Sequence, residues 1–247
     1  MHLSVRLTHG RVEYTMEKDL IIYNDNTGIS KKMAPLLKGE NINMIVTDSR
    51  RELMNLIMDE QTKLLLFDVE INGLSWYNGV EVLSEIRSRS IIPVIVVSAQ
   101  GAESAKVMAL NAGADDYVMV DCNPLELLAR IKCQFRRYGQ LVSSPKHTGH
   151  VYRVEGLEVN DLSRSVTVDG REVKLTPSEY EILKLLVQEQ GRVFSISQIY
   201  EAVWHMQAYG VDNTIAVHIR HIREKIERNP KDPHYLKVVW GTGYKVG

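Results

Sequence analysis

The first half of the chain alternates short apolar runs with segments of helical spacing. Five apolar runs are predicted as strands: 20–23, 42–46, 63–67, 93–97 and 116–120. The segments between and after them are predicted as helices: about 29–38, 50–59, 79–88, 103–112 and 124–137. Continuous apolar runs are typical of parallel strands that are buried on both faces. The pattern therefore predicts an α/β domain with a doubly wound (βα)5 architecture.

The pattern changes after residue 150. Residues 152–159 and 165–175 alternate apolar and polar side chains, which predicts antiparallel strands with a hairpin turn at Asp169-Gly170. Thr176 and Glu179 have the spacing of a capping box, which predicts a helix start. The remaining predictions are a helix opening at Ser195 or Ser197 and ending near Trp204, a helix over 212–228 and a hairpin over 235–246. Three helices followed by a hairpin predict a winged helix-turn-helix.

The helix predicted over 212–228 has one apolar stripe. Ile215, Ile219, Ile222 and Ile226 recur at intervals of four, three and four. The other faces carry Thr214, Val217, His218, Arg220 and His221, with Arg223 and Lys225 toward the end. Such a helix suits the major groove of DNA, where base edges offer acceptors to arginine and a methyl group to valine. The alternative is an amphipathic surface helix with a solvated basic face.

Four segments follow from these patterns. Residues 1–18 are polar and weakly patterned, and they form an N-terminal extension or tag, with Met16 as an alternative start. Residues 19–138 form the first domain and residues 151–247 the second. Residues 139–150 are small and polar, with Gly and Pro, and they are predicted as a linker.

Composition excludes some classes of protein. The chain of 247 residues has a net charge of −1, so a nucleic-acid site must be a local cluster of cations. No apolar run approaches the 18 residues that a membrane span needs, and the N-terminus lacks an apolar signal-peptide core. Cys122 and Cys133 have no metal-type spacing and suit a reducing compartment. These features predict a cytoplasmic protein without a membrane partner.

Polar side chains gather where the predicted parallel strands end. Asn24, Asp25, Asp68, Ser98 and Val120 follow these strands. In doubly wound sheets, sites form at the carboxyl ends of the strands. Two carboxylates that meet there indicate a divalent-metal site or a nucleophilic aspartate. The alternative is that Asp25 and Asp68 only cap the loops that follow them.

Several motifs resemble the OmpR/PhoB family of response regulators. Gly113-Ala-Asp-Asp-Tyr117, Pro124-Leu-Glu-Leu-Leu-Ala-Arg-Ile131 and Leu64-Leu-Leu-Phe-Asp68 resemble its receiver domain over about residues 19 to 138. The resemblance implies a flavodoxin-like fold. Three further motifs resemble its DNA-binding domain over about residues 151 to 247: Leu175-Thr-Pro-Ser-Glu-Tyr180, Val217-His-Ile-Arg220 and Gly241-Thr-Gly-Tyr-Lys245.

The resemblance implies phosphoryl transfer from a sensor histidine kinase to the receiver. Asp68 would be the phosphoacceptor, and Asp25, Asp68 and the backbone of Glu70 would hold Mg²⁺, which neutralises the developing charge. Ser98 and Tyr117 would be the switch residues that sense the phosphate.

Three departures from the family's pattern weaken this chemistry. Val120 and Asp121 stand where the family usually has Lys-Pro, so the phosphate loses its ammonium partner. Asn24 replaces one carboxylate of the acidic pair, which lowers the expected affinity for metal. The longer loop that follows the phosphoacceptor strand leads to Trp76 and Tyr77, which could cover the pocket. We therefore expect an atypical, degenerate receiver that requires no cofactor and binds Mg²⁺ weakly.

The resemblance also implies a homodimer. In the family, the face of the fourth helix, fifth strand and fifth helix dimerises, and Lys106, Asp115, Asp116 and Arg130 match its charged positions. Exposed ion pairs contribute only about 0–1 kcal/mol each, so they would set the register more than the affinity.

DNA contacts follow from the same resemblance. The helix over 212–228 would enter the major groove and the terminal hairpin the adjacent minor groove of double-stranded DNA. The residues expected at bases are Asn213, Thr214, Val217 and His221, and those expected at phosphates are His218, Arg220, Arg223 and Lys245. Trp240 replaces a family arginine and is expected to pack within the hairpin. The loop 205–210 matches the segment that contacts RNA polymerase in activators, and the alternative is a plain connector between two helices.

The favoured hypothesis is a sequence-specific transcription regulator whose receiver dimerises without phosphorylation. The alternative is a conventional response regulator that is activated by phosphorylation of Asp68. A third hypothesis makes the receiver a docking module for another regulatory protein, with Trp76 and Tyr77 as anchors. We do not expect an enzyme, because the sequence has no nucleophile–base pair and no cofactor-binding loop.

Overall fold

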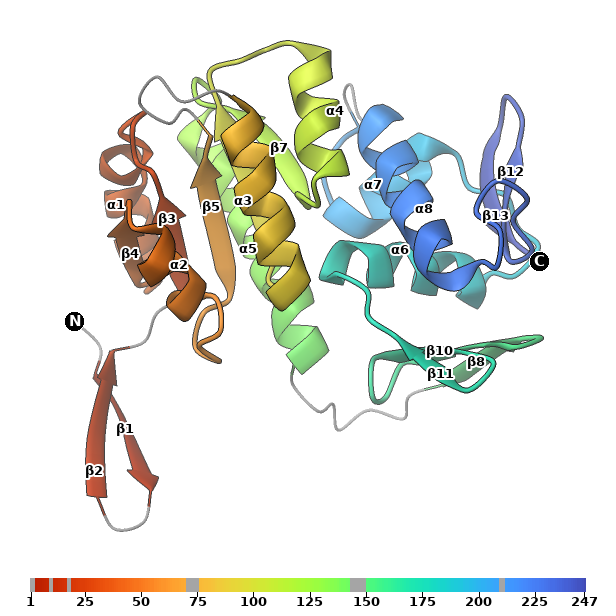
Figure 1. Ribbon diagram of the computed structural model, residues 1–247, viewed down its shortest axis with the longest axis horizontal. Coiled ribbons are helices and arrows are strands. Elements are labelled where there is room, and N and C mark those ends of the chain that lie inside the picture. The colour runs from red at the N-terminus through yellow and green to blue at the C-terminus, as the bar shows by residue number, and fades with distance from the viewer. Residues whose placement is uncertain (1–2, 9–10, 17–18, 70–75, 143–149, 209–211) are drawn as a thin grey trace. The chain divides into compact units, whose positions relative to one another are not determined.

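Figure 1 shows the computed structural model of the chain. The structure describes residues 3–8, 11–16, 19–69, 76–142, 150–208 and 212–247. The chain divides into two compact units, residues 1–132 and 133–247. The described N-terminal residues form an antiparallel pair of strands, β1 (Leu3–Thr8) and β2 (Arg11–Met16), where the sequence predicted only a weakly patterned extension.

The first unit contains a five-stranded parallel sheet. In chain order its strands are β3 (Leu20–Tyr23), β4 (Met44–Thr47), β5 (Leu64–Asp68), β6 (Val94–Ser98) and β7 (Asp116–Met119). Their order in the sheet is β4-β3-β5-β6-β7, and every neighbouring pair is parallel. Strands β3, β5 and β6 are buried along their whole length, as continuous apolar runs predict.

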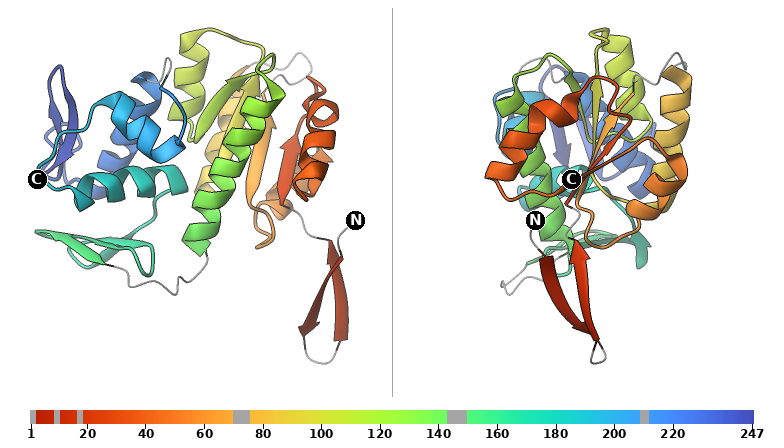
Figure 2. Two further views of the ribbon diagram at one scale, coloured as in Figure 1. Left: turned by 180° about the vertical axis from the view of Figure 1, so that it is seen from behind. Right: turned by 90° about the vertical axis from the view of Figure 1, so that its left-hand side faces the viewer.

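Helices cover both faces of this sheet. They are α1 (Ile29–Gly39), α2 (Arg50–Leu56), α3 (Trp76–Arg89), α4 (Glu103–Asn111) and α5 (Pro124–Val142). Figure 2 shows α1 and α5 on one face and α2 and α3 on the other. The doubly wound prediction is therefore confirmed. The predicted linker is wrong for residues 139–142, because α5 continues through Val142.

A buried ion pair joins α3 to the start of β7. Arg87 donates from Nη2 to Asp115 Oδ2 at 2.6 Å and from Nε to the Gly113 carbonyl at 2.6 Å. The same Asp115 oxygen accepts from the Val94 amide at 2.9 Å, and none of the Asp115 side chain is exposed. Because Asp115 and Val94 are fully buried and Arg87 is largely buried, the pair ties three segments of the first unit together.

The second unit begins its antiparallel sheet at residue 151. The strands are β8 (Val151–Val154), β9 (Leu157–Asn160), β10 (Ser165–Val168) and β11 (Arg171–Val173), and they pair in the order β11-β10-β9-β8. Asp169 and Gly170 have φ values of 50° and 77°. Positive φ at both central residues is what a two-residue type I′ hairpin requires, so the predicted turn is confirmed.

Three helices and a second hairpin complete this unit. They are α6 (Pro177–Gln188), α7 (Ile196–Trp204), α8 (Asp212–Ile226), β12 (Leu236–Val239) and β13 (Gly243–Val246). Capping boxes start α6, through Thr176 and Glu179, and α7, through Ser195 and Gln198. The first was predicted, and the second selects Ser195 over Ser197.

The isoleucine stripe of α8 lies in the core of the second unit. Ile215, Ile219, Ile222 and Ile226 are each at most 2% exposed and pack with residues of α6, α7 and β9. The hairpin β12–β13, the wing, is fastened to the segment before α7 by two backbone hydrogen bonds of 2.9 Å between Phe194 and Tyr244. A Cβ at Gly243 would lie 1.9 Å from the Phe194 carbonyl oxygen, so only glycine fits at this close approach.

We predict that Asp115→Ala lowers the free energy of unfolding of the first unit by about 3–5 kcal/mol. The reason is that the substitution leaves the guanidinium of Arg87 buried without its carboxylate. Urea denaturation followed by circular dichroism measures the change.

The control is Arg89→Ala on the same helix. Arg89 forms an ion pair with Glu85 at 2.9 Å, but about half of its side chain is exposed, so the loss should stay below about 1 kcal/mol. Equal losses in the two variants would contradict a structural role for the buried pair.

Candidate functional site

The carboxyl ends of β3 and β5 bring two predicted site segments together. Asp68 ends β5, and its side chain is fully buried. Its Oδ2 accepts a hydrogen bond from the Thr27 amide at 2.8 Å, and Thr27 lies two residues after Asp25 in the loop between β3 and α1. The structure thus places Asp68 against the loop that carries Asp25, as the sheet topology predicts.

The carboxylate of Asp25 accepts hydrogen bonds from the first turn of α1. Its Oδ1 accepts from the Ser30 amide at 2.9 Å, and its Oδ2 forms a short hydrogen bond with the Ser30 hydroxyl. Both carboxylate oxygens therefore satisfy donors at a helix start, where negative charge is favourable. This geometry matches the alternative in which Asp25 caps the segment that follows it.

The described residues fit Mg²⁺ poorly. Asn24 is 7% exposed with φ of 57°, and its Nδ2 is buried without a hydrogen-bond partner among the described residues. The amide of Asn24 offers Mg²⁺ only a neutral oxygen in place of a charged carboxylate, and Mg²⁺ demands oxygen ligands in near-octahedral geometry. The oxygens of Asp25 are already engaged by Ser30, and Glu70 lies outside the described residues. No role in the function of this protein is therefore assigned to Mg²⁺.

Val120 occupies the position of the missing lysine, and a different lysine approaches it. The Val120 amide donates to the Ser98 carbonyl at 2.9 Å, which continues the pairing of β6 with β7. The Val120 carbonyl accepts from Nζ of Lys32, on α1, at 3.4 Å. The sequence could not identify Lys32, because 88 residues separate it from Val120 and an exposed lysine on a helix carries no signal by itself.

Gln100 connects the two predicted switch residues. Ser98 is fully buried, and its hydroxyl accepts from the Gln100 amide at 3.0 Å. The Tyr117 hydroxyl donates to the Gln100 carbonyl at 2.6 Å. Because both switch side chains bind the backbone of one residue between β6 and α4, a shift of either one would be transmitted to this loop.

The predicted dimer face needs one correction. Asp115 is fully buried in its pair with Arg87, so it cannot offer its charge to another subunit. Asp116 is also buried and accepts from Arg130 within the chain at 2.8 Å, while Arg130 forms a second pair with Glu126 at 2.7 Å. Lys106 lies half-buried on α4, 3.9 Å from Glu103.

Fewer side chains of α8 are exposed to solvent than the sequence predicted. Thr214, Val217 and His218 are 2%, 7% and 2% exposed, so the prediction that they face outward is wrong for this conformation. Arg220 is 63% exposed and pairs with Glu224 at 2.8 Å. Asn213 and His221 are half-buried. Arg220 is therefore the most exposed of the residues predicted to contact DNA on this helix.

Contacts with α6 and α7, including the buried carboxylate of Glu179, accompany this burial. Its Oε2 accepts from the Thr176 amide at 2.8 Å and from Lys225 Nζ at 2.5 Å. The imidazole of His221 lies 3.9 Å from the other oxygen. The ring of His218 packs 5.7 Å from that of Trp204 on α7. A second stripe of α8 thus faces α6 and α7 beside the isoleucines.

His221 is expected to stay neutral at physiological pH. Burial lowers the pKa of its imidazole below the ordinary 6.5, with the nearby Glu179 acting in the opposite direction. Any added positive charge from His221 at the DNA would therefore require a pH below its ordinary pKa.

Glu179, His218 and His221 also lie close enough to be considered as metal ligands. One ligand atom from each lies within 4.8 Å of the others. However, the ammonium of Lys225 already binds this carboxylate, and a metal cation would have to displace it. The cluster is better described as the contact that holds α8 against the start of α6.

The wing carries cations and an exposed aromatic ring. Arg223 of α8 donates from Nε to the Leu236 carbonyl at 2.9 Å and lies 5.9 Å over the Tyr244 ring, so it braces the wing. Burial lowers the pKa of its guanidinium. Lys245 is half-buried and pairs across the hairpin with Lys237. Trp240 is 88% exposed, so the predicted packing within the hairpin is wrong.

Comparison with known proteins agrees with this architecture. Residues 20–132 match the response regulator receiver domain, and residues 170–246 match the C-terminal domain of transcriptional regulatory proteins. The chain is 32% identical to the regulatory protein VanR of Enterococcus faecium over 94% of this chain and 99% of VanR. It is 30% identical to the transcriptional regulatory protein SrrA of Staphylococcus aureus over 93% and 95% of the two chains.

A solved structure of a RitR mutant has the same fold. It matches with a TM-score of 0.69 and 18% identity, over 93% of this chain and 99% of that one. None of the helices in the described part of the chain has the length and apolar character needed to cross a membrane. The two domains, in this order, and the relatives that span nearly the whole chain establish the family. The chain belongs to the OmpR/PhoB-type response regulators, which are non-enzymatic two-component proteins with a transcription-regulatory DNA-binding domain.

Proposed function

We propose that this protein regulates transcription as a DNA-binding homodimer whose receiver dimerises without phosphorylation. The observation that carries the proposal is Val120 at the end of β7. A valine side chain cannot donate a hydrogen bond or neutralise the charge of a phosphoryl group on Asp68. The engagement of Asp25 with Ser30 and the amide at Asn24 support the same conclusion, because both weaken the metal site.

One observation favours the conventional, phosphorylation-dependent function. Lys32 Nζ lies 3.4 Å from the Val120 carbonyl, so α1 supplies a cation at the backbone position where the family's lysine stands. If Lys32 neutralises a phosphoryl group on Asp68, the switch through Ser98, Gln100 and Tyr117 would still operate. Lys32 therefore separates the two functions experimentally.

DNA recognition is proposed to use α8 and the wing. Arg220 is more exposed than Lys225, the other exposed cation of α8 in the described residues, and Asn213 and His221 are proposed as polar groups for base edges. On the wing, Lys237 and Lys245 form a cross-strand pair of cations, and the exposed ring of Trp240 lies next to the turn. Because these cations are few, one subunit should bind weakly, and a pair of subunits on repeated half-sites is the proposed binding form.

Other partners follow from the same assignment. The dimer face is proposed to comprise Lys106 and the Asp116–Arg130 pair, in which the buried Asp116 positions Arg130, while Asp115 is buried against Arg87. The loop 205–210 is the proposed contact with RNA polymerase, and a sensor histidine kinase is a partner only in the phosphorylation-dependent alternative. Trp76 and Tyr77, proposed as anchors for a further regulatory protein, have side chains outside the described part of the structure.

We predict that Arg220→Ala weakens binding to all DNA sequences. Loss of one phosphate contact should reduce the slope of log affinity against log salt by about one. Fluorescence anisotropy at several salt concentrations, on a fragment selected from a random pool and on random DNA, measures both effects.

The matched control is Arg153→Ala on β8. Its side chain is 64% exposed and pairs with Glu158, as that of Arg220 is exposed and pairs with Glu224. The same loss in the control would show that net charge, rather than α8, determines binding. Val217→Ala should lower stability rather than relax base preference, because Val217 is buried.

We predict that beryllofluoride with Mg²⁺ leaves both DNA affinity and dimerisation of the wild type unchanged within about two-fold. Asp68→Asn should bind DNA as the wild type does. Anisotropy and sedimentation velocity at micromolar protein and fixed salt measure the two properties.

Lys32→Gln identifies which function is present. If beryllofluoride tightens the binding of the wild type, and Asp68→Asn and Lys32→Gln each abolish that gain, the phosphorylation-dependent function is correct. A wild type that is monomeric until beryllofluoride is added would also refute our proposal.

A further inference from the structure

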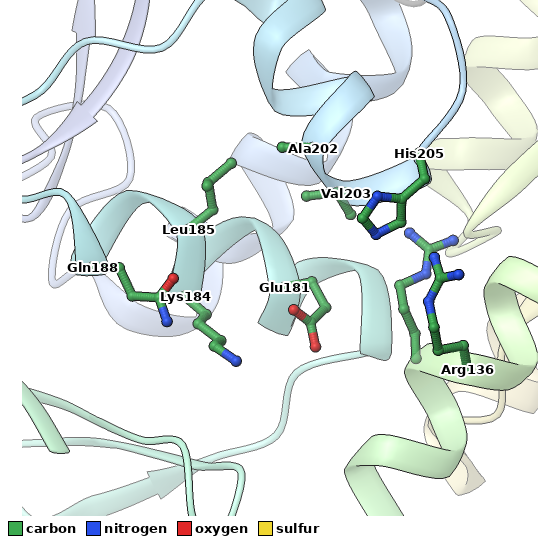
Figure 3. Close-up of a pocket in the computed structure, with 9 residues that line it drawn as sticks. Arg136, Glu181, Lys184, Leu185, Gln188, Ala202, Val203 and His205 are labelled. Atoms are coloured by element: carbon green, nitrogen blue, oxygen red, sulfur yellow. The ribbon is translucent and has the colours of Figure 1, made fainter. Parts of the chain in front are cut away.

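A pocket of about 250 Å³ lies in the second unit, which begins within α5 at Cys133. It lies between the end of α5 and the facing sides of α6 and α7. Its charged lining consists of Arg136, Arg137, Glu181, Lys184 and His205. Figure 3 shows Arg136 and His205 close together at one end and Gln188 at the other. The volume falls just below the range of about 300–1,000 Å³ for drug-sized ligands, so the pocket suits a small molecule.

Arg137 is the lining residue whose polar atoms lack partners. It is 3% exposed, and its guanidinium lies 4.7 Å over the ring of Trp204. Its Nε and both Nη atoms are buried, and none has a hydrogen-bond partner among the described residues. A guanidinium is charged at every physiological pH, and a ring face attracts it without accepting its N–H groups in conventional hydrogen bonds. The donors of Arg137 therefore lack an acceptor among the described residues, although the residue lines the pocket.

The other charged residues do not neutralise Arg137. Lys184 pairs with Asp161 at 2.6 Å, and Glu181 pairs with Arg164 at 2.8 Å, so these two lining residues are compensated by partners outside the pocket. Arg136 is exposed, and its Nη2 donates to the thiol sulfur of Cys133 at 3.4 Å. The two arginines thus leave an excess of about two positive charges at one end.

The neighbouring histidine responds to this excess. The pKa of His205 is lowered, first by burial and then by the positive charges of Arg136 and Arg137. At neutral pH its imidazole can therefore donate a hydrogen bond without adding charge.

We propose that this pocket binds a small dianionic oxyanion of the phosphate class, held by the guanidinium groups of Arg136 and Arg137. Two planar guanidinium forks match the oxygens of a phosphate group, and two positive charges balance its two negative charges. Leu185, Ala202 and Val203 add an apolar wall that can contact the organic part of a phosphorylated small molecule. The lining residues do not include Asp68, so this is a different site from the proposed phosphoacceptor.

Isothermal titration calorimetry of the full chain with inorganic phosphate tests the proposal, at an ionic strength held constant with chloride. We expect saturable binding of one phosphate per chain. Arg137→Gln and Arg136→Gln should each weaken it about ten-fold or more, because each removes a charged hydrogen-bond donor. Arg153→Gln, an exposed arginine on β8, should leave it unchanged.

One further titration tests which site binds phosphate, and another tests which class of ligand the pocket accepts. Phosphate could instead bind the DNA-contacting surface, in which case Arg220→Gln would abolish binding and the two pocket variants would not. Succinate tests a dicarboxylate in place of phosphate. Absence of saturable phosphate binding, loss only in Arg220→Gln, or binding of succinate alone would each overturn the proposal. If Arg137→Gln does not fold, as judged by circular dichroism, Arg136→Gln decides, because its exposed side chain is not stacked on Trp204.

Discussion

The buried carboxylate of Glu179 helps to determine how the second unit presents α8, the helix that we propose binds DNA. One oxygen caps the start of α6 through the Thr176 amide and binds Lys225 of α8, and the other lies near His221. Hydrogen bonds to charged groups contribute about 1.5–3 kcal/mol each, and removing one partner leaves the other buried and uncompensated. The capping box is therefore also the contact that sets the rotation of α8.

The rotation of α8 decides which residues are available to DNA. With His218 against Trp204 and Lys225 on Glu179, the exposed face of the helix narrows to the side that carries Arg220. The wing depends on the same helix, because Arg223 holds the Leu236 carbonyl. Few cations of α8 and the wing remain exposed. This is the physical reason for proposing that two subunits bind DNA together.

The cations that could neutralise a phosphate group lie at two places in this chain. At the end of the parallel sheet, the family's lysine is replaced by Val120, and Lys32 reaches the same backbone from α1. In the second unit, Arg137 is buried without an acceptor among the described residues, beside Arg136. The two proposals, a receiver that dimerises without phosphorylation and a pocket that binds phosphate, are compatible, because the pocket's lining does not include Asp68.

Local patterns determined the elements of this protein, and tertiary contacts decided the roles of individual side chains. Apolar runs, the Thr176 capping box and Asp169-Gly170 act within a few residues of chain, so the two folds and most element positions followed from the sequence. The sheet topology and the family's motifs also predicted that Asp68 lies against the loop that carries Asp25. Burial of Thr214, Val217, His218 and Asp115, exposure of Trp240 and the approach of Lys32 did not follow. Each depends on partners distant in the chain, such as Glu179 for α8 or Arg87 for Asp115, and spacing along a helix cannot tell which of two polar faces meets another element.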